Sequence, residues 1–111
     1  QPWIMEVYAS TVPRPYASSV AQELFESGTI PADTDFRIFR DFGKLSGVDL
    51  AWSTNGYVYH THLDTADRVP LGALQHTGDN VLALTHGLLA SEKLEFSGDE
   101  DEGQPVFFDV P

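Results

Sequence analysis

The sequence predicts an α/β fold, and three observations support this prediction. Residues 48–52 (VDLAW) have the apolar composition of a buried strand, and residues 57–60 (YVYH) are aromatic and β-branched, as strands often are. Apolar residues recur with helical periodicity over residues 70–91. The length of 111 residues fits one domain or part of one, and a hydrophobic content of 41% suffices for a core.

Two helices are predicted near the start of the chain. The first covers residues 3–12 and ends at Pro13, because proline cannot continue a helix. The second covers residues 15–27, and Gly28 is its natural stop. The apolar residues of the second helix fall on one face, at Tyr16, Val20 and Leu24.

A short helix and a long helix are predicted further along the chain. Asp33 or Thr34 is expected to cap the short helix over residues 35–42. The long helix over 70–91 is expected to cover one face of a sheet that contains the strand at 48–52. The two tryptophans are expected to anchor the core, at Trp3 and Trp52.

Turn and linker signals divide the rest of the chain. Asn55-Gly56 is a strong turn signal. Residues 97–103 (SGDEDEG) read as an acidic, solvated linker, and residues 106–110 are apolar again. We therefore expect a domain portion over residues 1–96, followed by a segment over 97–111 that leads out of it.

The composition excludes several functional classes. Six Lys and Arg against 17 Asp and Glu give a net charge of −11, which argues against nucleic acid or an anionic membrane as partner. The absence of cysteine excludes a disulfide framework, a thiolate zinc site and a cysteine nucleophile. No apolar run is long enough to span a bilayer. Because the chain begins with Gln1, we expect it to be an excised piece of a longer protein.

The densest group of chemically useful side chains lies at residues 60–67. If the preceding strand continues, His60, His62 and Asp64 share one face of it, because side chains alternate with period two. Nitrogen and oxygen ligands of this kind suit zinc. If the strand instead ends at Tyr59, His60 lies at the end of a strand, and the segment can equally be a polar loop with solvated histidines.

The order of residues in this segment resembles a family motif. Tyr59-His60-Thr61-x-x-Asp64-Thr65 is similar to the motif of the co-catalytic zinc aminopeptidases, the relatives of aminopeptidase Y and glutamate carboxypeptidase. Residues 32–36 resemble the stretch that precedes a strand in that family, and residues 47–51 take the position of the strand. A narrower resemblance to membrane-anchored members covers nearly the whole chain, through residues 20–28, 30–43, 55–61, 78–80 and 106–110.

This resemblance implies a fold and a metal site. The fold would be a three-layer α/β/α domain with a mixed central sheet, of which this chain is an incomplete part. The site would hold two zinc ions through two histidines and three carboxylates, with a glutamate as general base. Only His60 matches a ligand, the last in the chain, and the others would precede Gln1. The isolated chain is therefore predicted to be inactive, since catalysis needs about three protein ligands per zinc.

The resemblance also suggests residues that brace the site. Asp64, Tyr59 and Thr61 are expected to lie around His60, and Asp64 is a candidate acceptor for its second ring nitrogen. Either Asp33 or Asp35 would match the family aspartate. Three of these residues have a purely structural alternative: an Asx turn for Asp64, simple packing for Tyr59, and helix capping for Asp33.

The function that the resemblance implies is hydrolysis of peptide bonds by a zinc metallopeptidase. Its partners would be a peptide substrate and the rest of the peptidase domain, with no nucleic acid, and with membrane contact only through segments outside this chain. The implied location is the luminal side of the endoplasmic reticulum membrane. The alternative is a non-catalytic, peptidase-like domain that serves as a binding or assembly module of a membrane protein.

Overall fold

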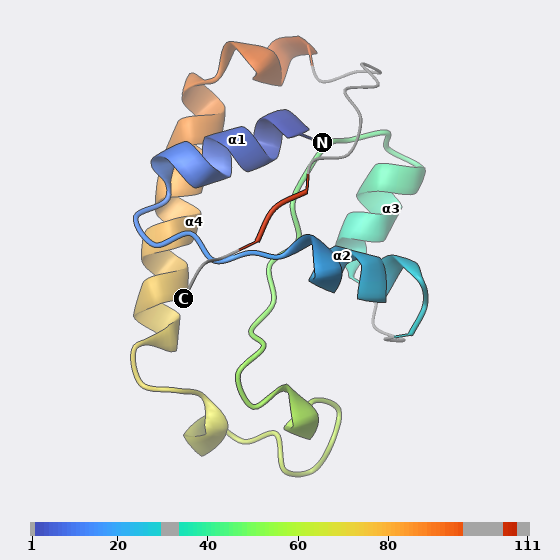
Figure 1. The fold of residues 1–111 in the computed structure, drawn as a ribbon, viewed down its shortest axis with the longest axis vertical. Coiled ribbons are helices and arrows are strands. Elements are labelled where there is room, and N and C mark those ends of the chain that lie inside the picture. Colours follow the sequence, from blue (N-terminus) through green and yellow to red (C-terminus); the bar gives the residue numbers. More distant parts are fainter. Residues whose placement is uncertain (1, 30–33, 97–105, 109–111) are drawn as a thin grey trace.

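The computed structural model describes residues 2–29, 34–96 and 106–108, and every element within them is helical. Figure 1 shows helices α1 and α4 together on one side and α2 and α3 on the other, with an extended segment between them. A long loop at the lower end of the molecule connects this segment to α4. The α-helices within these ranges are α1 (Pro2–Thr11), α2 (Ser19–Glu26), α3 (Asp35–Asp41) and α4 (Ala73–Ala90). The 3₁₀ turns are η1 (Gly56–Val58), η2 (Ala66–Arg68) and η3 (Glu92–Phe96).

The predicted α/β fold with a mixed central sheet is wrong for this structure. Residues 48–52 carry no strand, and residues 57–60 form η1 and the turn after it. A strand must pair its backbone N–H and C=O groups with a neighbouring strand. The part of the chain that the structure describes offers no such neighbour, so the apolar segment at 48–52 stays unpaired.

The helix predictions are confirmed, with shorter bounds for α2, α3 and α4. The helix predicted over 15–27 begins only at Ser19, and Gly28 adopts the left-handed backbone of a helix stop, with φ 73°. Thr34, rather than Asp33, is the observed cap of α3, because its side chain accepts a hydrogen bond from the Phe36 N–H at 3.3 Å. The long helix α4 starts after Gly72, inside the predicted range.

The core lies where α1 packs on α4. Its buried centre consists of Tyr8, Val12 and Leu84, with Val48 of the extended segment packed against them. Trp3 is buried, as predicted. Trp52 is 49% exposed and does not anchor the core; instead its Nε1–H donates to Thr77 Oγ1 on α4 at 2.6 Å.

Polar contacts hold the turn between α1 and α2 against the core. The Tyr8 hydroxyl accepts from the Tyr16 N–H at 2.9 Å and donates to the Tyr16 carbonyl oxygen at 3.1 Å. On α4, Asn80 Nδ2 donates to the Arg14 carbonyl oxygen at 2.9 Å, and His76 Nε2 lies 3.0 Å from the same oxygen. Because a carbonyl oxygen only accepts, this contact assigns a proton to His76 Nε2.

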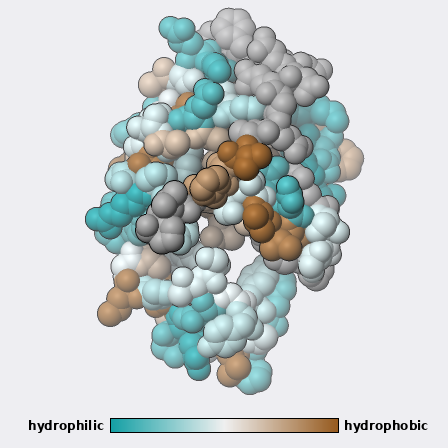
Figure 2. All heavy atoms as spheres, viewed as in Figure 1, coloured by the Kyte–Doolittle hydropathy of each residue, from teal (hydrophilic) through white to brown (hydrophobic). Residues whose placement is uncertain are grey.

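Large apolar areas remain exposed. Helix α4 has a second apolar face beside the one that meets α1, with Leu74 75%, Leu82 60% and Leu89 70% exposed. Figure 2 shows apolar atoms near the middle of this face of the molecule, and among the exposed apolar residues are Val20 at 63% and Val106 at 83%. The Ser19 N–H donates to the Phe107 carbonyl oxygen at 3.0 Å, which places residues 106–108 beside α2. No helix in the described part of the chain has the length and apolar character needed to cross a membrane.

Candidate functional site

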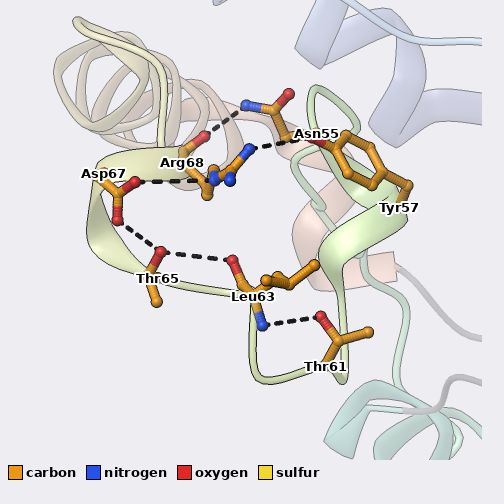
Figure 3. A network of polar contacts seen from close by, with 7 residues as sticks. All are labelled: Asn55, Tyr57, Thr61, Leu63, Thr65, Asp67 and Arg68. Atoms are coloured by element: carbon orange, nitrogen blue, oxygen red, sulfur yellow. Dashed lines mark hydrogen bonds and ion pairs between the residues drawn. The ribbon is translucent and has the colours of Figure 1, made fainter.

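The segment that carries the family motif is a loop closed on itself between Asn55 and Arg68 (Figure 3). Asn55 has a left-handed backbone, with φ 60° and ψ 21°, and begins η1. Its Nδ2 donates to the Arg68 carbonyl oxygen at 2.6 Å, across 13 positions of sequence. Asparagine tolerates the left-handed conformation better than most residues. Asn55 thus turns the chain through its backbone conformation and closes the loop through its side chain.

Hydroxyl groups fix the path of the loop between its ends (Figure 3). Thr61 Oγ1 donates to the Val58 carbonyl oxygen at 2.5 Å and accepts from the Leu63 N–H at 3.1 Å. Thr65 Oγ1 donates to Asp67 Oδ1 at 2.6 Å and lies 3.4 Å from the Leu63 carbonyl oxygen. These local bonds favour a turning backbone over the extended one predicted for 57–60.

A charged pair lies at the closing end of the loop. Arg68 Nε lies 3.7 Å from Asp67 Oδ2, and an Arg68 terminal nitrogen donates to the Tyr57 hydroxyl at 3.3 Å. The hydrogen bond from Thr65 is the main cause that lowers the pKa of Asp67 below 3.8, followed by the backbone N–H of Asp67 and the charge of Arg68. The ion pair itself is exposed, so its contribution to stability is small.

Replacing Thr65 with valine is expected to raise the pKa of Asp67 toward 3.8, because the hydroxyl that favours the carboxylate is removed. Since the folded pKa is lowered, the carboxylate stabilises the fold at pH above its unfolded pKa, and this contribution disappears as pH falls through the folded pKa. Carboxyl NMR titration of both proteins measures the shift. Asp41, whose pKa is lowered chiefly by its hydrogen bond with Arg40, is an internal control that should not change. An unchanged Asp67 pKa would contradict the prediction.

His60 lies within this loop in a left-handed backbone conformation, with φ 61°. Its side chain is exposed, and its ring stacks on the ring of Tyr59 with 3.9 Å between centroids and 20° between planes. Among the described residues, neither ring nitrogen of His60 has a hydrogen-bond partner. A histidine at positive φ costs of order 1–3 kcal/mol and persists where its surroundings enforce it. The loop thus presents an imidazole with both nitrogens accessible.

His60 does not form a metal-binding group with His62 and Asp64 in the described part of the chain. His62 and Asp64 are exposed, and no group of three or more potential metal ligands forms anywhere in the described ranges. The hypothesis of a self-contained site of His60, His62 and Asp64 therefore has no support in the structure. Thr61 braces the backbone next to His60 through Val58, whereas Asp64 contributes a backbone N–H to the Thr61 carbonyl oxygen at 3.2 Å.

Asp33 lies outside the described residues. Asp35 occupies the first turn of α3, where a negative charge is favourable near the helix N-terminus. The neighbouring Thr34 Oγ1 donates to Asp49 Oδ2 at 2.6 Å, which ties the start of α3 to the extended segment. Tyr59 is the predicted bracing residue whose ring directly contacts His60.

Two residues that close the loop were missed by sequence reasoning. Asn55 was predicted only as part of a turn, and Arg68 was given no role. The Asn-Gly pair signals the left-handed turn, but no local pattern reveals that the Asn55 amide reaches Arg68. That contact depends on how the whole intervening loop folds.

Comparison with known proteins identifies the class to which this loop belongs. The family model described as "Peptidase family M28" matches residues 1–85, a span that contains the complete Tyr59-His60-Thr61 motif. The chain belongs to peptidase family M28, which confirms the resemblance found in the sequence. No solved structure matches the chain.

The relatives are named as peptidases of the endoplasmic reticulum or of the vacuolar membrane. The chain is 52% identical over 109 residues to endoplasmic reticulum metallopeptidase 1 of Mus musculus, covering 98% of this chain and 12% of the relative. It is 47% identical to the putative endoplasmic reticulum metallopeptidase 1-A of Caenorhabditis elegans, covering 97% of this chain and 12% of that protein. It is 32% identical to a vacuolar membrane protease of Phaeosphaeria nodorum, covering 88% and 10%. The chain thus spans only about an eighth of the length of the first two relatives.

Proposed function

We propose that this chain supplies one metal ligand, His60, to the active site of a zinc metallopeptidase that hydrolyses peptide bonds. The observation that carries the proposal is the family match over residues 1–85 together with the exposed presentation of His60. A neutral imidazole nitrogen is a common zinc ligand. The loop leaves both nitrogens of this imidazole accessible, and the stacked Tyr59 ring restricts how the imidazole can rotate.

The donor set of this chain fits zinc only in part. His60 offers one nitrogen, and the described residues form no larger ligand group, so the remaining ligands must come from outside this part of the chain. When bound, zinc polarises a carbonyl group and lowers the pKa of its bound water toward about 7. In this proposal the residues of the chain hold and orient a ligand, while the general base lies elsewhere in a longer protein. The chain by itself is therefore expected to be inactive.

The proposed location is the luminal side of the endoplasmic reticulum membrane. The names of the mammalian and nematode relatives support the endoplasmic reticulum, and the fungal relative is also named for a membrane. Membrane attachment would come from segments outside this chain. The proposed partners are a peptide substrate and the remainder of the peptidase domain, which would cover exposed apolar surface such as the outer face of α4.

The test is metal-dependent hydrolysis by a full-length protein that contains this chain. The purified protein should cleave aminoacyl reporter peptides, lose that activity after chelation and recover it when zinc is added back. The isolated chain, assayed in parallel, should show no cleavage above background. A full-length protein that folds and binds no zinc would instead support a peptidase-like binding module. Cleavage by the isolated chain would refute the proposal that this chain supplies only one of the metal ligands.

A further inference from the structure

We propose that Asn55 is a positioning residue for the metal ligand His60, acting through the closure of the loop 55–68. This inference rests on the proposed function of His60. It concerns a residue that the motif does not contain and that does not itself contact a metal or substrate. The observation that carries it is the hydrogen bond from the Asn55 amide to the Arg68 carbonyl oxygen at 2.6 Å (Figure 3), which closes the segment whose sequence contains His60.

The loop depends on its own residues for its shape. Among the described residues, the side chains of residues 55–68 form hydrogen bonds only with other groups of the same segment. A compact surface loop whose ends lie close together is a common carrier of function. If the hydrogen bond between the two ends were lost, the backbone between them, which the hydroxyl groups of Thr61 and Thr65 hold in place, could change its conformation.

His60 is the residue most sensitive to such an opening. Its φ of 61° is unfavourable for a residue with a Cβ, so the left-handed conformation persists only while the surrounding contacts enforce it. The stacking of His60 on Tyr59 in turn depends on this local backbone. When the closing hydrogen bond is lost, the backbone at His60 can relax to negative φ values. The imidazole then changes its orientation.

The closing contact can be removed without disturbing the backbone that Asn55 adopts. Glycine populates positive φ readily, so Asn55→Gly keeps the left-handed turn and deletes only the amide donor. Arg68 accepts this bond through its backbone carbonyl, so Arg68→Ala keeps the closure and deletes only the contacts with Tyr57 and Asp67. Arg68→Ala is therefore a matched control at the other end of the same hydrogen bond.

The experiment measures zinc affinity and peptide hydrolysis of the full-length protein by competition with a chromophoric chelator and by steady-state kinetics. Asn55→Gly is expected to weaken zinc binding by about two- to tenfold, the range of one net hydrogen bond, while Arg68→Ala changes it less than twofold. At saturating zinc, kcat should fall more than KM rises. Should Asn55→Gly fail to fold, Asn55→Asp serves instead, because aspartate tolerates positive φ and cannot donate.

The outcomes separate this proposal from the proposed function. Zinc binding that depends on His60 but is unchanged in Asn55→Gly would overturn the role of Asn55 alone. An equal loss in Asn55→Gly and Arg68→Ala would also overturn it, because the side-chain contacts of Arg68 would then be responsible. Zinc binding unaffected by replacement of His60 would overturn the proposed function itself.

Discussion

A full-length protein that carries His60→Asn is expected to lose its peptidase activity by more than about 100-fold, because removal of a metal ligand exceeds the 10–100-fold cost of losing an outer-shell partner. Asparagine is the suitable replacement because the backbone at this position is left-handed, with φ 61°. Asparagine adopts that conformation more readily than other residues with a Cβ. The variant therefore removes the imidazole while leaving the loop its present backbone.

His62→Asn is the matched control for this prediction. It removes an exposed imidazole two residues away, and His62 belongs to no ligand group among the described residues. Its activity and zinc content should stay within about twofold of the unmodified protein. Zinc content by elemental analysis separates loss of metal from loss of chemistry. Equal activity of the His60 and His62 variants would refute the assignment of His60 as a ligand.

Alanine substitutions at two glycines of α4 are expected to change the free energy of unfolding with opposite signs. A Cβ at Gly87 would lie 2.7 Å from Thr11 Cγ2 and 2.9 Å from Val7 Cγ1 of α1. Both neighbours are β-branched and stiff at χ1, so α1 and α4 must separate. Overpacking costs about 1–3 kcal/mol, and the better helix propensity of alanine returns up to about 1 kcal/mol. Gly87→Ala should thus destabilise the chain by up to about 2 kcal/mol.

Gly78→Ala provides the contrast on the same helix. A Cβ at Gly78 would have nothing within 4 Å, so only the helix propensity changes. This variant should gain about 0.5–1 kcal/mol. Urea unfolding of the isolated chain, followed by circular dichroism, measures both changes against the unmodified chain. Stabilisation by Gly87→Ala would show that α1 does not pack closely against α4 at this position.

The helices were predictable because their signals are local. The periodicity of apolar residues indicated α4, Pro13 marked the end of α1, and Gly28 marked the end of α2. The predicted sheet was wrong because it did not rest on local signals alone. The segment 48–52 has strand composition, but composition alone supplies no neighbouring strand, and the described residues contain none.

The sequence offers the candidate site as a list of residues, whereas their arrangement comes from the structure. The motif singled out His60 and its neighbour Tyr59, and in the structure the rings of these two residues stack on each other. The positive φ of His60 and the link from Asn55 to Arg68 could not be read from local pattern, because both result from closure of the whole loop. Hydrogen bonds between residues far apart in sequence depend on the folded path of the chain.

The second apolar face of α4 has a consequence for how copies of the chain behave in solution. Leu74, Leu82 and Leu89 offer each copy a hydrophobic surface, while the net charge of −11 makes copies repel one another. Salt screens that repulsion over a Debye length of about 8–10 Å and leaves the apolar attraction in place. Self-association of the isolated chain is therefore expected to increase as ionic strength rises. A protein whose copies associate through opposite charges would behave in the reverse way.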